Sequence, residues 1–394
     1  MNMNRLLWII LSIFTVYCYS QDNENNISVR MAESVMQRHP DVYGNWNYVT
    51  GTVLKGFEAV WRASGDERFF NYIKNTIDNV VDEQGRIRHY RVEEYNIDQV
   101  NSGRMLLFLY KETGEEKYKK AAELVRSQFD GHPRISSGGF WHKQIYPWQM
   151  WLDGLYMGCP FYAEYSLIFN EPEQFNDVVK QFILIDQHLK DQKTGLYYHA
   201  WDESKQMFWA DKETGLSQCF WGRGLGWYTM AIVDVLDYLP NDHAGRDSLI
   251  RILNSLAETL TKYQDETGLW WQVLDQANRE GNYLEGSASS MFVYALAKAL
   301  NLDYIDPKYL KTMKLGFKGI LEHLIYEDSR GQLNLLRNCR GAGLGGNYID
   351  KIRDGSYEYY VYIEPIVPND GKGVGPFMMA CVEIEKLKAN RKIK

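Results

Sequence analysis

The chain has 394 residues, of which 45% are hydrophobic and 24% are charged, and its net charge is -7. This composition excludes a disordered chain, and the absence of a basic run argues against nucleic-acid binding. Aromatic residues are abundant at 14% of the chain, with 28 Tyr and 12 Trp. Their amphipathic rings suit a wet cleft, in which ring faces stack and polar edges form hydrogen bonds, and sugars are one class of ligand that uses such clefts.

The N-terminal residues have the features of a secretory signal peptide. Arg5 precedes an apolar run at residues 6–16, which is too short to span a bilayer. Residues 18–20 resemble a small-x-small cleavage site, so we expect residues 1–20 to be removed and the mature chain to be periplasmic or secreted. A lipid anchor at Cys18 is the second interpretation, because Tyr17 stands where such a site needs a small residue. No other segment is predicted to span the membrane.

Two kinds of helix alternate along the rest of the chain. Amphipathic patterns predict outer helices at 66–81 and 115–129, whereas segments that are apolar on nearly every side predict buried inner helices at 100–110 and 155–169. Turns or short hairpins are expected around Gly85, Gly195, Gly268 and Gly331. The inner helices start near six positions, which are Trp46, Asp98, Asp153, Trp221, Glu285 and Gly373.

Six inner helices require six outer partners. The last inner helix, at 374–387, ends near the C-terminus, so its partner is expected to be the N-terminal helix at about 27–38. The sequence therefore predicts an all-α (α/α)6 barrel, in which the two ends of the chain close a ring of six helix pairs, as one domain over residues 21–394. The alternative is an open α-solenoid, which is disfavoured because the termini lack polar capping repeats.

The cysteines and histidines give no metal-binding pattern. Four cysteines follow the expected cleavage site, and they lie far apart without a CxxC motif: Cys159, Cys219, Cys339 and Cys381. A structural zinc site is therefore not indicated. Buried free thiols are favoured, and one disulfide stays open. The eight histidines form no HExxH or HxH element, so we expect neither a metal nor a cofactor.

Chemically active side chains gather at the predicted starts of the inner helices, which meet at one mouth of such a ring. Three carboxylates there, Asp98, Asp153 and Glu285, form a candidate polar site. Each also has a structural interpretation, because Asp is favoured at helix N-caps and in first turns, where it is worth about 1 kcal/mol. Capping explains both aspartates at least as well as catalysis does. Arg223, beside a tryptophan, suggests a fixed guanidinium that binds a planar carboxylate.

Several longer motifs make the interpretation more specific. They are FWHKQIYPWQMWLDGLYMG, TGLYYHAWDE, FWGRGLGWY, ETGLWWQVLD, YLEGSASSMFVYALAKAL and GVGPFMMACVEIE. In these motifs the chain resembles the unsaturated glucuronyl and galacturonyl hydrolases, and most closely the unsaturated rhamnogalacturonyl hydrolases of glycoside hydrolase family 105. The resemblance implies an (α/α)6 barrel that removes a 4,5-unsaturated uronic acid from the non-reducing end of oligosaccharides made by lyases. It also implies hydration of the enol-ether double bond in place of displacement at the anomeric carbon.

The resemblance also assigns roles to residues. Asp153 in WLDG matches the acid/base that protonates C4 and activates the water that adds at C5, and Asp98 in NIDQVNSGR matches the second carboxylate. The positions that match the substrate site are Tyr48, His142, Lys143, His199, Trp221, Arg223 and, more weakly, Trp227.

Two departures from the family pattern concern the substrate. In WNYVTG, Asn47, Val49 and Thr50 replace two histidines and a glutamine of a characterised branch, and Gly224 replaces a larger residue. Both are expected to alter the site for the sugar beside the cleaved bond.

Two other functions stay open at this level. A conventional inverting glycosidase or a lyase could use the same fold, and a non-catalytic carbohydrate-binding protein could use the same aromatic cleft. The expected partner is an unsaturated uronic-acid oligosaccharide from rhamnogalacturonan, ulvan or a glycosaminoglycan. No nucleic-acid partner is expected, and the oligomeric state stays open.

Overall fold

The computed structural model describes residues 27–348 and 351–391, over which it contains twelve α-helices and four two-stranded sheets. The expected signal peptide and Cys18 lie outside the described residues. Six helices form an inner ring: α3 (Tyr48–Ser64), α5 (Gly103–Thr113), α7 (Leu152–Ile168), α9 (Gly222–Val235), α11 (Gly286–Asn301) and α13 (Gly371–Arg391). Six lie outside it: α2 (Ile27–Arg38), α4 (Glu67–Asp78), α6 (Glu116–Gly131), α8 (Gln174–Leu189), α10 (Arg246–Lys262) and α12 (Leu310–His323).

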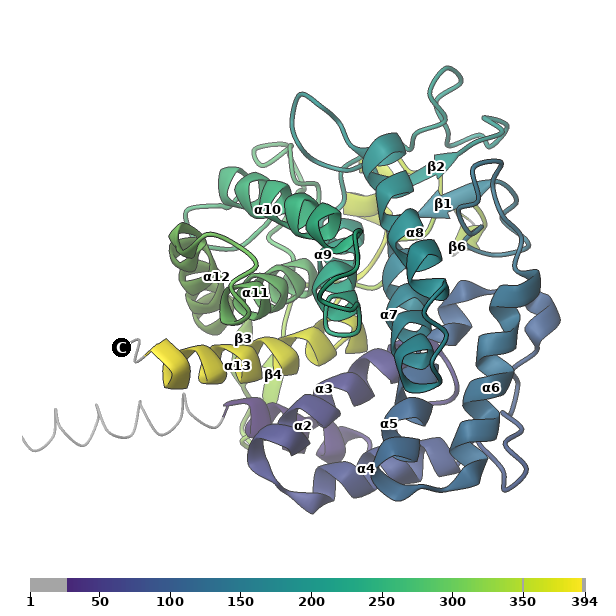
Figure 1. The fold of residues 1–394 in the computed structure, drawn as a ribbon. Helices are drawn as coiled ribbons and strands as arrows, with labels where there is room; N and C mark the ends of the chain where they lie inside the picture. Colours follow the sequence, from purple (N-terminus) through teal and green to yellow (C-terminus); the bar gives the residue numbers. More distant parts are fainter. Residues whose placement is uncertain (1–26, 349–350, 392–394) are drawn as a thin grey trace, which may run out of the picture.

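The inner helices form a closed ring. Each packs against the next in chain order, and α13 packs against α3 as well as α11 (Figure 1). The outer helix α2 packs against α13, so the first and last described helices form the sixth pair. The predicted (α/α)6 barrel is therefore confirmed, and the open solenoid is wrong because its terminal helices would not touch.

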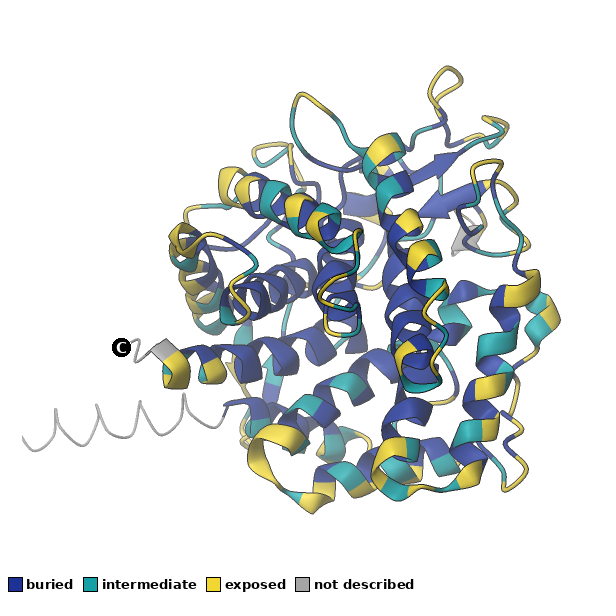
Figure 2. Cartoon of the chain, in the orientation of Figure 1, coloured by how far each residue is buried: buried dark blue, intermediate teal, exposed yellow. Residues whose placement is uncertain are grey.

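Burial explains why the two sequence patterns differ. All residues of α9 are buried, whereas α4 buries only one face, through Phe69, Tyr72, Ile73, Thr76 and Ile77. Figure 2 shows the same contrast around the ring, with inner helices buried on every side and outer helices exposed on one. A helix in the inner ring contacts neighbours on all sides and so needs apolar or small residues throughout. The helices predicted at 66–81, 100–110, 115–129 and 155–169 correspond to α4, α5, α6 and α7.

The predicted glycine turns are present after the outer helices. Gly85, Gly195, Gly268 and Gly331 all have positive φ, between 75° and 88°, which a residue without Cβ adopts at no steric cost. The turn at Gly331 joins β3 (Ile325–Glu327) to β4 (Leu333–Leu335) as an antiparallel hairpin.

The other strands lie in the connections that lead into the inner helices. β1 (Gln149–Trp151) comes directly before α7 and pairs with β2 (Ala200–Asp202). Between α12 and α13, β5 (Asn338–Cys339) pairs with β8 (Ile366–Val367), and β6 (Asn347–Tyr348) pairs with β7 (Lys351–Ile352). These connections therefore enclose the end of the barrel at which the inner helices begin.

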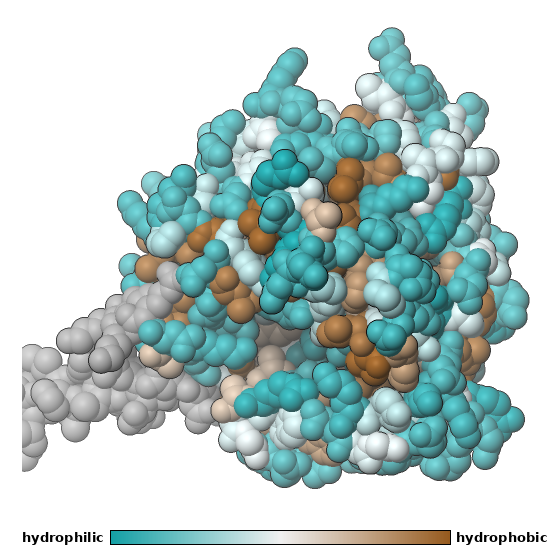
Figure 3. All heavy atoms as spheres, in the orientation of Figure 1, coloured by the Kyte–Doolittle hydropathy of each residue, from teal (hydrophilic) through white to brown (hydrophobic). Residues whose placement is uncertain are grey.

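The outer surface is mostly polar. On the face in Figure 3, hydrophilic residues predominate and hydrophobic ones occur in small groups. None of the helices in the described residues is long and apolar enough to cross a membrane. Within the same residues the four cysteines are free and buried, so no disulfide joins them.

Candidate active site

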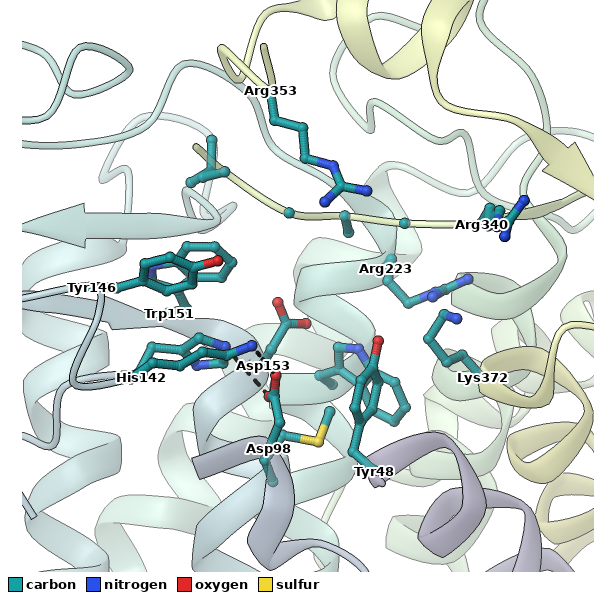
Figure 4. A pocket seen from close by; sticks show the side chains of 17 residues that line it. Tyr48, Asp98, His142, Tyr146, Trp151, Asp153, Arg223, Arg340, Arg353 and Lys372 are labelled. Atoms are coloured by element: carbon teal, nitrogen blue, oxygen red, sulfur yellow. Dashed lines mark ion pairs between the residues drawn. The ribbon is translucent and has the colours of Figure 1, made fainter. Parts of the chain in front are cut away.

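A pocket of about 230 Å³ opens where the inner helices begin. It is lined by residues of four inner helices, α3, α7, α9 and α13, and of three connections, those before α5, α7 and α13. These residues are Tyr48, Asp98, His142, Lys143, Tyr146, Trp151, Asp153, Met157, Arg223, Trp227, Arg340, Gly341, Ala342, Gly343, Leu344, Arg353 and Lys372 (Figure 4). Of the nine site residues expected from sequence, seven lie in this lining, and His199 and Trp221 lie behind it.

Asp98 is an ionised carboxylate and not a cap. It lies in a short 3-10 turn, η2 (Ile97–Val100), which precedes α5 and is capped by the Asn96 side chain. Lys143 Nζ lies 2.7 Å from Asp98 Oδ2, and His142 Nε2 lies 3.4 Å from Oδ1. Burial alone would raise the pKa of Asp98, but Lys143 and His142 outweigh it and hold that pKa well below its ordinary value.

Asp153 is also not a cap. It is the second residue of α7, and no side chain caps this helix start. Asp153 Oδ2 lies 3.0 Å from His199 Nε2. Its other oxygen, Oδ1, is buried and makes no hydrogen bond with any described residue. Neither aspartate is an N-cap, but both lie in the first turn of their helices, where an acidic side chain is favoured, so the first-turn part of the structural interpretation is correct. Asp153 lines the pocket and has one buried carboxylate oxygen without a hydrogen-bond partner among the described residues.

His199 lies behind Asp153 and is fully buried. Its backbone oxygen accepts a hydrogen bond from Leu152 N at 3.0 Å, which ties it to the start of α7. A Cβ at Gly224 would lie 2.3 Å from His199 Nδ1. The small residue at 224 thus makes room for this imidazole, and its expected effect on the neighbouring sugar site stays a prediction.

The other departure also serves the fold. Asn47 caps α3, because its side chain accepts hydrogen bonds from Val49 N and Thr50 N at 2.9 and 3.1 Å. Thr50 Oγ1 donates to Asn45 O. Only Tyr48 from this motif reaches the pocket lining. Burial and the charge of Asp98 raise the pKa of its hydroxyl, which stays neutral and able to donate.

Parallel rings form one wall of the pocket. The His142 ring stacks on Trp151 with centroids 4.5 Å apart and planes 1° apart, and Tyr146 stacks on Trp151 at 5.3 Å and 5°. Figure 4 shows this stack beside the two aspartates. Trp227 also lines the pocket and stacks on Tyr156 at 4.7 Å.

Trp221 supports the site from behind. It is fully buried, with its ring 4.4 Å from that of His199, and it also packs on Tyr360. It is not among the residues that line the pocket, and its predicted role near the sugar stays a prediction.

Arg223 is rigidly held at the pocket wall. It is the second residue of α9, with Nε donating to Ser287 Oγ and Nη2 donating to Cys339 O at 2.6 Å. Glu285 Oε1 lies 3.8 Å from Nη2. Glu285 itself accepts a hydrogen bond from Ala288 N and caps α11, so the structural interpretation is correct for this carboxylate. A fixed guanidinium of this kind suits a planar anion.

Three cationic residues of the lining were not predicted as site residues from the sequence. Arg340, Arg353 and Lys372 come from the connection between α12 and the start of α13. Lys372 Nζ lies 2.9 Å from Asp370 Oδ1 and 5.9 Å from the centre of the Tyr48 ring. Their only signal in the sequence is the glycine-rich stretch after Arg340, which does not say which cavity a loop covers. Within the described residues, no group of three or more His, Cys, Asp or Glu side chains is arranged to hold a metal ion.

Comparison with known proteins agrees with this geometry. The model of Glycosyl Hydrolase Family 88 matches residues 27–388. The chain belongs to this family. A glycoside hydrolase from family 105 of C. acetobutylicum ATCC 824 is 48% identical, with a TM-score of 0.88 over 91% of this chain and 99% of its own.

Two relatives of known sequence also resemble this family 88 hydrolase. Protein Atu3128 of Agrobacterium fabrum is 39% identical over 231 residues, which are 58% of this chain and 97% of that protein. The unsaturated rhamnogalacturonyl hydrolase YesR of Bacillus subtilis is 28% identical over 291 residues, which are 72% of this chain and 78% of that protein. The chain is therefore a glycosidase on a barrel that its relatives share.

Proposed function

We propose that this hydrolase removes a 4,5-unsaturated uronic acid from the non-reducing end of oligosaccharides made by polysaccharide lyases. The observation that carries the proposal is that the two pocket carboxylates differ in their hydrogen-bond and ion-pair partners. Lys143 and His142 hold Asp98 ionised, whereas Asp153 Oδ1 lacks a hydrogen-bond partner in the described residues. The name of the Bacillus subtilis relative supports the same chemistry.

The proposed reaction uses Asp153 as the proton donor and acceptor and keeps Asp98 ionised. Asp153 donates a proton to C4 of the enol ether, and positive charge develops at C5 and the ring oxygen. A water molecule adds at C5 and gives its proton to the Asp153 carboxylate, which restores the acid. The hemiketal at C5 then opens, and the hemiacetal at C1 expels the rest of the oligosaccharide. One water is consumed, and general acid–base catalysis by one residue serves both proton transfers.

The remaining lining residues bind and orient the sugar. Asp98, being ionised, accepts hydrogen bonds from sugar hydroxyls and favours the positive charge that develops at C5. The stacked His142 and Trp151 rings offer a flat face to the sugar ring. Arg223 binds the uronate carboxylate, because its guanidinium is held in place before substrate arrives.

The test follows the ultraviolet absorbance of the enol ether in lyase digests of uronic-acid polymers. Wild-type protein should abolish the absorbance and release one oligosaccharide shortened by one residue. Asp153→Asn should lower kcat by roughly 100- to 10,000-fold and leave the circular dichroism spectrum unchanged. The exposed Asp247→Asn serves as the matched control. Absence of turnover on every digest would refute the reaction, and full activity of Asp153→Asn would refute the assignment of the acid.

We also infer that the chain is exported. Arg5 and the apolar run at 6–16 support removal of residues 1–20. Fractionation of producing cells, with mass spectrometry of the N-terminus, tests this. Cytoplasmic protein that retains Met1 would contradict it, and a lipid on Cys18 would favour the anchored form.

A further inference from the structure

Arg353 belongs to a charged pair that is built into the roof of the pocket. Its side chain is 26% exposed and lines the pocket, and its Nε lies 3.5 Å from Glu364 Oε2. Glu364 is fully buried and does not line the pocket, and Oε2 also accepts a hydrogen bond from the Tyr359 hydroxyl at 3.1 Å. A buried carboxylate thus braces a guanidinium that faces the cavity.

Two glycines of the lining give this pair its space. A Cβ at Gly341 would lie 2.5 Å from Glu364 Oε1, and a Cβ at Gly343 would lie 3.3 Å from Arg353 Cδ and 3.4 Å from Nη1. Neither glycine has the positive φ that would itself require glycine. The absence of a side chain at both positions is therefore explained by contact with the pair, and the segment that begins at Arg340 is fitted around it.

The pair lies apart from the Arg223 site. Figure 4 shows Arg353 reaching the pocket from one side of the segment that leads from Arg340, with Arg223 and Lys372 on the other side. Arg223 is oriented by different partners, Ser287 and Cys339 O. A single carboxylate is satisfied by one guanidinium through two parallel hydrogen bonds. The unsaturated uronate carries one carboxylate, so a second braced guanidinium is in excess of what that sugar needs.

We propose that Arg353, braced by Glu364, binds a second anionic group of the substrate, a sulfate ester or a carboxylate on the sugar next to the unsaturated uronate. This rests on the proposed function, since it extends the substrate by one residue. The pocket volume of about 230 Å³ agrees with this. It is smaller than the roughly 300–1,000 Å³ of sites that enclose drug-sized ligands, so the neighbouring sugar lies at the opening. Arg353 is a specificity residue for that sugar, and it takes no part in the proton transfers.

The experiment compares three purified unsaturated disaccharides. One carries a sulfate on the neighbouring sugar, the second is its chemically desulfated form, and the third has a uronate in that position. Wild-type protein should show the higher kcat/KM on an anionic member, and the sulfated and uronate arms identify which anion is bound. Arg353→Gln should reduce the preference for that member over the neutral one by at least roughly ten-fold, mainly through KM. Arg353→Lys should restore part of the preference.

Two further variants separate binding from folding. Gly341→Ala leaves Arg353 in place but displaces Glu364, and it should weaken the same preference. Arg330→Gln removes a guanidinium that is 73% exposed on the β3–β4 turn, and it should not change the preference. Equal kcat/KM of the wild type on all three disaccharides, or an equal loss on all three in Arg353→Gln, would overturn the proposal while the hydrolase function stands. No turnover of any disaccharide by the wild type would overturn the hydrolase function itself.

Discussion

Lys143 Nζ lies 2.7 Å from Asp98 Oδ2, although Asp98 comes from the turn before α5 and Lys143 from the connection before α7. His142, the preceding residue in the chain, approaches the other oxygen of the same carboxylate. Two neighbouring residues thus hold one carboxylate ionised in a buried setting. In the proposed reaction, Asp153 is the group that exchanges protons, and Asp98 stays ionised because of Lys143 and His142.

Lys143→Met should therefore move the pH dependence of the reaction. Without the cation, burial prevails and the pKa of Asp98 rises. Asp98 is then protonated at pH values where it is ionised in the wild type, and the acid limb of kcat/KM against pH moves to higher pH. Lys143→Arg keeps the positive charge and should leave the acid limb close to that of the wild type. Superimposable acid limbs in Lys143→Met and the wild type would show that Lys143 does not control Asp98.

A second charged cluster stabilises the barrel away from the pocket. Asp234 on α9 is fully buried and accepts hydrogen bonds from Arg104 on α5 at 2.9 Å and from Lys298 and Tyr294 on α11 at 2.8 and 2.6 Å. Asp234→Asn removes the one carboxylate that Arg104 is seen to pair with and leaves Lys298 with Asp237 alone, and it should cost about 3–5 kcal/mol in the free energy of unfolding. The exposed Asp247→Asn should change it by no more than about 0.5 kcal/mol. Urea unfolding monitored by circular dichroism measures both.

The same cluster predicts the sign of an acid effect on stability. Burial would raise the pKa of Asp234, but Lys298 and Arg104 outweigh it and hold the pKa far below its ordinary value. A carboxylate with a depressed folded-state pKa contributes fully above its unfolded pKa of about 3.9. This contribution is lost as the pH falls towards the folded-state value. The wild type should therefore lose stability more steeply than Asp234→Asn below about pH 4, and equal slopes would contradict this.

Gly224→Ala tests the positioning role of His199. The added methyl group would lie 2.3 Å from His199 Nδ1, so the imidazole must move and Asp153 loses its neighbour. We expect a cost of about 1–3 kcal/mol in unfolding free energy and a fall in kcat with a smaller change in KM. Ala231→Gly, in the same helix, should cost about 1 kcal/mol and keep kcat. A loss of stability in Gly224→Ala with kcat unchanged would show that His199 only fills space.

The fold was predictable because the burial of each helix determines the pattern of apolar residues in its sequence. Helices in the inner ring are apolar on all sides and outer helices on one, so their alternation predicts six pairs, and the pairing of 27–38 with 374–387 follows from the count. The two aspartates were found from their motifs, although spacing alone could not exclude capping. The hydrogen bond of Asn96 at η2 removes that alternative for Asp98.

The rest of the site was not predictable because it depends on contacts between distant segments. Arg353 lies in a long connection with no helical period, and nothing in its neighbours indicates that this connection lines the same pocket as Asp153. Lys372 lies at the start of a predicted inner helix, but its position there does not show that it reaches the pocket. The need for a small residue at Gly224, in α9, was not predictable either, because it depends on contact with His199, which lies in the connection between α8 and α9. The charges of such loops can be read from the sequence, but the cavity that they face cannot.

Lys372 belongs to the first turn of α13, the last described helix. It lies 5.9 Å from the ring centre of Tyr48, which begins the second described helix. A ribosome therefore releases every other part of the pocket before the segment that completes it. Until α13 has emerged and packed between α3 and α11, the nascent chain has neither a closed ring nor a full set of lining cations. Closure of the ring and completion of the pocket lining thus depend on the same helix, α13.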